Sequence, residues 1–252
     1  MRSQPLQGQT AIVTGAARRI GRQIALNLAR AGARVAVNTR ASVAQAEAVV
    51  EEIVASGGEA MLAQCDVTDP DAVRTMVNHV VDRFGGVEIL IHNAVSREHA
   101  PLHELTLESW RQSMAIVLDG AFLCSQNVVP HMEKAGHGSI LFIGGASAFL
   151  GSEGPALPTA KSGLVGLTRS LALSLGPKGI RVNLLSPGRI ESEVDDASKL
   201  ERLSRSRPVD RIPLRRTGTP EEVARTATAL VGPDFSYLTG QTVHLAGGLV
   251  MQ

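Results

Sequence analysis

TGAARRIG, residues 14–21, is the stretch that decides the fold of this chain. It follows a short run of mostly apolar residues, Thr10–Thr14, and leads into an amphipathic stretch, Ile20–Ala31. A glycine-rich turn in this place lets the backbone approach a pyrophosphate, and the start of the helix presents aligned N–H groups to it. The stretch therefore predicts a dinucleotide site, with a simple tight turn as the alternative. The candidate contacts are Gly15, Arg18, Arg19, Ile20 and Gly21.

The same alternation of short and long segments continues along the chain. Seven short runs predict strands: Thr10–Thr14, Arg34–Val37, Ala60–Gln64, Val87–His92, Ser139–Ile143, Arg181–Leu185 and Thr242–Leu245. Six longer stretches predict helices: Ile20–Ala31, Val43–Ser56, Asp71–Phe84, Leu107–Glu133, Ala160–Leu175 and Glu221–Val231. Strands that alternate with crossover helices form a parallel sheet covered on both faces. We therefore predict the α/β class: one Rossmann-type domain over residues 1–252 with a doubly wound, seven-stranded parallel sheet.

Two stretches toward the C-terminus add detail to this prediction. Thr219-Pro220-Glu221-Glu222 is a capping box with proline at the first helical position, which marks the start of a helix. Glu191–Arg216 is irregular and highly charged. It follows the predicted sixth strand, so we expect a substrate lid over about residues 189–216.

Composition excludes several classes of function. The net charge of +1 gives no electrostatic footprint for nucleic acid and no polybasic signal for a membrane surface. No apolar run reaches the roughly 18–20 residues of a membrane-spanning helix. Cys65 and Cys124 match no metal-ligand spacing, and we expect buried thiols in a reducing cytosol and no metal site. The sequence thus predicts a cytoplasmic protein that acts on a small molecule.

Further motifs resemble those of the short-chain dehydrogenase/reductase family over essentially all 252 residues, most nearly 3-oxoacyl-carrier-protein reductases. They include Cys65-Asp66-Val67, His92-Asn93-Ala94-Val95, Ser186-Pro187-Gly188 and Tyr237–Gln241 with Gly247-Gly248. The resemblance implies that Asp66 and Val67 contact adenine and that Pro187 and Gly188 lie beside the nicotinamide. It also implies cofactor contacts from Asn93 and Lys161. Arg19 departs from the family pattern, because it replaces the middle glycine of Thr-Gly-x-x-x-Gly-x-Gly.

The cofactor preference is read from the end of the second strand, Val37-Asn38-Thr39-Arg40. NAD-selective members of the family have an aspartate near Thr39, whereas this chain has no carboxylate from residue 33 to 46. Arg18 and Arg40 together suit a dianionic 2′-phosphate. We therefore expect NADP(H) to be favoured over NAD(H); the alternative is that both are ordinary solvated arginines.

The catalytic positions of the family are mostly changed. Family members combine a serine that contacts the substrate oxygen, a tyrosine that transfers the proton, a lysine and an asparagine that anchors a water relay. By the resemblance, this chain has Gly145, Leu157, Lys161 and Val117 at those positions. The position seven before the lysine, where enoyl-reductase-like members have a tyrosine, is Gly154. Reduction of an ordinary ketone should therefore be severely impaired.

Ser147 is the other candidate catalytic residue beside Lys161. It lies two residues after Gly145 and could face the same pocket, although a strand-end hydroxyl that bonds the backbone is the alternative. Weaker candidates are Ser152, Glu153, Thr159 and Arg189.

Three functions remain open at this stage. Hydride transfer needs only a positioned nicotinamide and an electrophile, so the chain could reduce an activated carbonyl without the tyrosine. It could instead be a catalytically inactive NADP(H)-binding sensor or partner subunit, or a non-redox lyase or isomerase. In each case we expect a homo-oligomer, most simply a homotetramer with D2 symmetry, because Leu107–Glu133 and Ala160–Leu175 have apolar residues on more than one face.

Overall fold

The computed structural model describes residues 4–96, 100–191 and 209–251, whose centre is one parallel sheet. Within these residues the sheet has seven strands in the order β3-β2-β1-β4-β5-β6-β7, which confirms the predicted fold class. The strands are β1 (Thr10–Val13), β2 (Arg34–Thr39), β3 (Ala60–Gln64), β4 (Ile89–His92), β5 (Gly138–Ile143), β6 (Ile180–Pro187) and β7 (Thr242–Leu245). Their apolar runs are buried by helices on both faces, as a parallel sheet requires.

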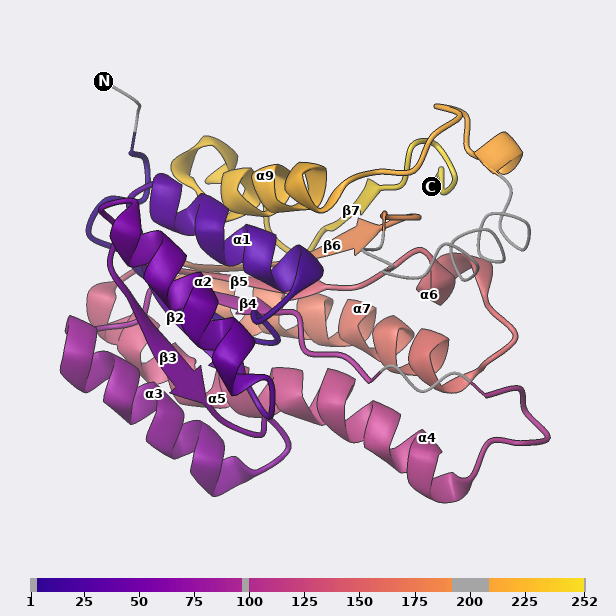
Figure 1. The fold of residues 1–252 in the computed structure, drawn as a ribbon, viewed down its shortest axis with the longest axis horizontal. Coiled ribbons are helices and arrows are strands. Elements are labelled where there is room, and N and C mark those ends of the chain that lie inside the picture. The colour runs from indigo at the N-terminus through magenta and orange to yellow at the C-terminus, as the bar shows by residue number, and fades with distance from the viewer. Residues whose placement is uncertain (1–3, 97–99, 192–208, 252) are drawn as a thin grey trace.

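Helices cover the two faces in separate layers (Figure 1). One layer consists of α1 (Arg19–Arg30), α2 (Val43–Ala55) and α9 (Pro220–Val231), which pack on one core. The other consists of α3 (Pro70–Phe84), α4 (Leu107–Met114), α5 (Gly120–Ala135) and α7 (Ala156–Leu175), and it encloses a second core. No helix within the described ranges is both long and apolar enough to cross a membrane.

The predicted continuous helix Leu107–Glu133 is wrong in its middle. A π-helical segment, Ala115–Asp119, separates α4 from α5. Gly120 follows it at a close contact: a Cβ there would lie 2.9 Å from Val67, beyond the end of β3, and 3.2 Å from the His92 ring on β4. Extra residues in a helical turn are a local device for fitting a helix to a neighbour, and no apolar periodicity reveals them.

The start of α7 also differs from the prediction. The helix begins at Ala156 and not at Ala160, so Leu157 and Lys161 lie one turn apart on the same helix. Pro158 is tolerated because it lies in the first turn, where its missing N–H would have no partner in the helix. A short helix that the sequence did not predict, α6 (Ser147–Leu150), precedes this region.

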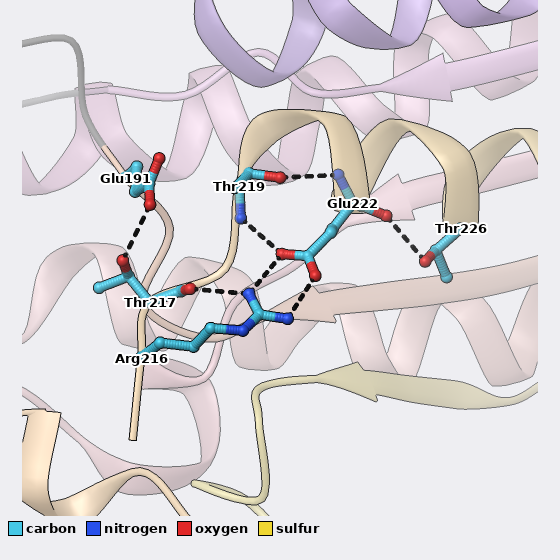
Figure 2. Close-up of polar contacts among 6 residues, drawn as sticks. All are labelled: Glu191, Arg216, Thr217, Thr219, Glu222 and Thr226. Carbon is cyan, nitrogen blue, oxygen red and sulfur yellow. Dashed lines mark hydrogen bonds and ion pairs between the residues drawn. The ribbon is translucent and has the colours of Figure 1, made fainter. Parts of the chain in front are cut away.

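The predicted capping box is confirmed at the start of α9. Glu222 N donates to Thr219 Oγ1 at 3.2 Å, and Thr219 N donates to Glu222 Oε2 at 2.9 Å (Figure 2). Most of the expected lid, residues 192–208, lies outside the described residues. Its two flanks meet in a parallel bridge between Ile190 and Gly218, with Glu191 N donating to Gly218 O at 2.8 Å.

Candidate cofactor and active-site cleft

A cleft of about 1460 Å³ lies at the carboxyl ends of the central strands. This is the edge at which ligands bind in doubly wound folds. Seven of the predicted site residues line it together: Arg19, Ile20, Asn93, Ser147, Lys161, Pro187 and Gly188. Five others, Gly15, Arg18, Gly21, Arg40 and Asp66, surround the adjoining ends of β1, β2 and β3 but do not line the cleft itself.

Gly15 and Gly21, in the glycine-rich turn, stand at positions with little or no room for a side chain. Gly15 has a φ of 61°, and a Cβ at Gly21 would collide with Gly15 O and lie 2.6 Å from Asn93 Nδ2. Asn38, at the end of β2, steadies the turn: its backbone oxygen accepts a bond from Ala16 N at 2.8 Å and its Oδ1 accepts one from Gly15 N at 3.4 Å. A bare backbone turn at the start of α1 fits a pyrophosphate group.

Arg18 and Arg19 end the turn in different ways. Arg18 is the N-cap of α1, with extended backbone and an exposed side chain. Arg19 has a φ of 52°, the left-handed conformation that favours glycine, and it occupies the position of the family's middle glycine. The chain therefore holds a bulky residue in a strained conformation, and it places that residue on the cleft.

Buried His92 connects the turn to the π-helical segment. Thr14 Oγ1 accepts bonds from Asn93 N (2.9 Å) and Ala94 N (3.0 Å) and lies 3.2 Å from His92 Nδ1, while His92 Nε2 lies 3.3 Å from Ile116 O. These contacts fit a neutral ring that accepts from the threonine hydroxyl and donates from Nε2 to the carbonyl. Burial lowers the pKa of His92 to about 4, which keeps the ring neutral. The sequence indicated His92 only as part of the motif His92-Asn93-Ala94-Val95.

Arg40 has an acidic residue nearby, although the sequence around it, residues 33–46, contains none. Asp66, from the end of the neighbouring strand β3, lies 3.6 Å from it, so the expectation of no competing carboxylate is wrong. Burial opposes ionisation of Asp66, but hydrogen bonds from Thr68 and the nearby Arg40 outweigh it, so the pKa of this carboxyl is lowered overall. Residues 33–46 alone could not reveal the Arg40–Asp66 ion pair, because Asp66 follows β3. The parallel sheet places β3 beside β2. Val67 is buried and packs near Gly120.

Lys161 lines the other end of the cleft, beside the end of β5. Its Nζ donates to Gly144 O at 2.6 Å, just beyond the end of β5. A Cβ at Gly145 would lie 2.8 Å from the same Nζ, so the ammonium fills the space that a side chain at residue 145 would enter. Leu157 lines the cleft beside it, whereas Val117 is buried in the core. Burial lowers the pKa of Lys161 to about 8.

Ser147 and the weaker candidates separate into residues that line the cleft and residues that do not. Ser147, the first residue of α6 and not a strand end, lines the cleft together with Ser152 and Arg189. The Ser152 hydroxyl, however, donates to Gly154 O at 2.9 Å. Glu153 and Thr159 do not line the cleft, and the Thr159 hydroxyl donates to Pro155 O at 2.8 Å.

The C-terminal flank of the cleft is held by an ion pair that the sequence did not indicate. Arg216 donates to Glu222 through both terminal nitrogens, at 2.9 and 2.6 Å (Figure 2). The adjacent Thr217 lines the cleft, and its hydroxyl donates to Glu191 at 3.4 Å. Bidentate pairing fixes the orientation of an arginine, so this pair holds the flank against α9.

Comparison with known proteins identifies the family. A family model described as enoyl-(acyl carrier protein) reductase matches residues 15–250. The chain is 38% identical over 244 residues to the 3-oxoacyl-(acyl-carrier-protein) reductase FabG of Staphylococcus aureus strain Mu50, covering 96% of this chain and 98% of that one. It is 35% identical over 244 residues to a subunit of (2S)-((R)-hydroxy(phenyl)methyl)succinyl-CoA dehydrogenase from Thauera aromatica, covering 96% and 97%.

A solved structure agrees with these sequence matches. The short-chain dehydrogenase from Burkholderia cenocepacia, in complex with NADP, has a TM-score of 0.88 and 33% identity over 97% of this chain and 99% of that one. The chain therefore belongs to the short-chain dehydrogenase/reductase family, a family of NAD(P)-dependent oxidoreductases.

Proposed function

We propose that this chain is an NADP(H)-dependent oxidoreductase that transfers a hydride to or from an activated carbonyl substrate without a tyrosine acid. One observation carries the proposal: Leu157 lies on the cleft one turn before Lys161, where the family's phenol would act. Gly145 and Val117 likewise stand for the serine and the asparagine. The chain's single tyrosine, Tyr237, is fully exposed and does not line the cleft.

The bound dinucleotide would supply the hydride. The bare turn at Gly15 and Gly21 would receive the pyrophosphate, and Arg18 and Arg40 would lie near a 2′-phosphate. Asp66 and Val67 would border the adenine, with Asn93, Lys161, Pro187 and Gly188 toward the nicotinamide. The Arg40 guanidinium lies 3.6 Å from the Asp66 carboxylate. Because this contact is loose, the guanidinium could turn toward a phosphate. The NADP complex of the Burkholderia relative supports the choice of NADP(H).

An activated substrate follows from what the cleft lacks. A general acid contributes typically about 10²–10⁴ in rate, so an ordinary ketone should react slowly where the phenol is missing. A ketone whose oxygen carries negative charge readily needs less help. NADPH oxidation should therefore be measurable with diacetyl or a trifluoromethyl ketone and very slow with acetoacetyl thioesters. Turnover of acetoacetyl thioesters at roughly 1–10³ s⁻¹, the range of ordinary enzymes, would refute the proposal.

A second candidate is a catalytically inactive partner subunit that binds NADP(H). The Thauera relative is named as one subunit of a dehydrogenase, which favours this alternative. The two functions separate in one experiment. A protein that binds NADPH by fluorescence titration but oxidises it with none of the activated ketones would be the inactive subunit.

We also propose that the chain forms a homotetramer. Phe122 on α5 and Leu173 on α7 are 49% and 82% exposed, which leaves apolar side chains uncovered on the layer opposite α2. Light scattering should give a mass of about four times 26.5 kDa. Phe122→Glu with Leu173→Glu should lower that mass, whereas Val54→Glu, on α2, should not. A monomer at micromolar concentration would contradict the proposal.

A further inference from the structure

The position of the Lys161 ammonium suggests a role beyond cofactor binding. α7 projects the side chain to the end of β5, where Nζ bonds Gly144 O. A Cβ added at Gly145 would lie 2.8 Å from Nζ. A hydroxyl on that Cβ is the family's contact to the substrate oxygen. In this chain a charged N–H donor occupies the volume that such a hydroxyl would need.

Among the residues that the structure describes, no carboxylate is paired with this ammonium. Gly144 O, a neutral carbonyl, accepts its hydrogen bond at 2.6 Å, and apolar Leu157 lies one turn away on the same helix. Burial alone accounts for the lowered pKa of about 8, a value suited to proton transfer near neutral pH. Within the described ranges, the other charged residues that line the cleft come from the start of α1, the segment after β6 and the C-terminal flank: Arg19, Arg189, Glu191, Asp210 and Arg211.

We propose that Lys161 Nζ contacts the substrate oxygen and donates the proton to it, taking over from the missing phenol and hydroxyl. This inference rests on the proposed function. In the reduction, the carbonyl carbon gains a hydride from the reduced nicotinamide, and the π electrons move to the oxygen. The oxygen takes a proton from the ammonium, which leaves an alcohol, an oxidised cofactor and a neutral amine. Water entering the open cleft returns a proton to the amine.

The first test measures the lysine in the free protein. The chain has only four lysines, so protein labelled with ¹³C at lysine Cε gives a spectrum that Lys161→Met assigns by loss of one signal. That signal should titrate near pH 8. Gly145→Ala should shift it, because the new methyl group enters the space of Nζ. A Lys161 signal that titrates like the other three and ignores Gly145→Ala would overturn the proposed placement.

The second test separates proton donation from cofactor binding. Single-turnover oxidation of NADPH by diacetyl is followed at saturating NADPH in wild type, Lys161→Met and the control Lys134→Met, whose lysine is exposed at the end of α5. Loss of the proton donor should slow Lys161→Met by about 10²-fold or more at saturation, with the control unchanged. The wild-type rate should fall as pH rises through the Lys161 titration.

Each outcome is decisive. If saturating NADPH restores the Lys161→Met rate, the lysine only binds cofactor, and this inference fails while the proposed function stands. A wild-type rate that does not follow the titration of Lys161 has the same meaning. If wild type binds NADPH but oxidises it with no activated ketone, the proposed function fails and the donor role fails with it.

Discussion

The two ends of the cleft differ in how they are built. Around the glycine-rich turn, Asn38, Thr14 and Asn93 bond the backbone, and Gly21 leaves no room for a side chain. Around Lys161, the small residue Gly145 and the apolar residue Leu157 line the cleft, and Gly144 O accepts the ammonium's hydrogen bond. A phosphate site is made of backbone N–H groups and tight turns, whereas proton transfer depends on side-chain groups. One end can therefore keep its form while the other changes its chemistry.

Restoring the phenol would test this contrast most strongly. Leu157→Tyr with Gly145→Ser should raise the rate with acetoacetyl thioesters by about 10²–10⁴-fold, because it supplies a general acid and a hydroxyl. The serine requires Lys161 Nζ to move from its place 2.8 Å from the new Cβ, which a flexible side chain can do. NADPH oxidation is the measurement. Leu157→Phe with Gly145→Ser is the control, since it adds the ring without its proton. Equal rates in the two double variants would contradict the prediction.

Acidification should remove the stability that depends on the neutral His92 ring, which connects the glycine-rich turn to the π-helical segment. Because His92, with its pKa lowered to about 4, stays neutral in the folded protein but takes up a proton near pH 6.5 when unfolded, the free energy of unfolding falls as pH drops between these values. The difference between the pKa values of His92 in the unfolded and folded protein corresponds to about 3 kcal/mol in the free energy of unfolding. Urea unfolding of His92→Asn should lack this part of the pH dependence.

His79→Asn, which removes an exposed histidine, is the control and should keep the wild-type slope. The prediction concerns the slope and not the absolute stability, because losing the bonds to Thr14 and Ile116 destabilises the His92 variant at every pH. Parallel curves for wild type and His92→Asn would show that the ring is not held neutral.

The backbone-built end should tolerate no added methyl group. Gly21→Ala places a Cβ against Gly15 O and 2.6 Å from Asn93 Nδ2. Such overpacking costs typically about 1–3 kcal/mol and should lower the melting temperature of a chain of this size by roughly 2–12 °C. NADPH affinity should fall with it, because the turn must open. Gly166→Ala, at an exposed position of α7 where a Cβ would have nothing within 4 Å, should instead stabilise by roughly 0.5–1 kcal/mol. Calorimetry that finds both variants alike would refute the argument.

Cofactor preference should give the smallest change. Arg40→Ala should weaken NADPH binding by roughly tenfold and leave NADH binding nearly unchanged, because only NADPH has the 2′-phosphate. Arg74→Ala removes an arginine that is paired with Asp71 on α3 and should change neither affinity. Titration calorimetry measures all six affinities, those of the wild type and both variants for NADPH and NADH. Equal affinity of the wild type for NADPH and NADH, unchanged in Arg40→Ala, would remove the case for NADP(H).

The sequence by itself determined the α/β class and the seven-stranded parallel sheet, because strand–helix alternation and the turn at residues 14–21 are local patterns with few topological solutions. The resemblance to the family's motifs pointed to Lys161, Leu157 and Gly145. Only the tertiary structure brought Asp66 to Arg40, His92 to Ile116 and Lys161 Nζ to the space beside Gly145. These contacts join residues from different elements. Their distances depend on packing and burial, which no single stretch of sequence encodes.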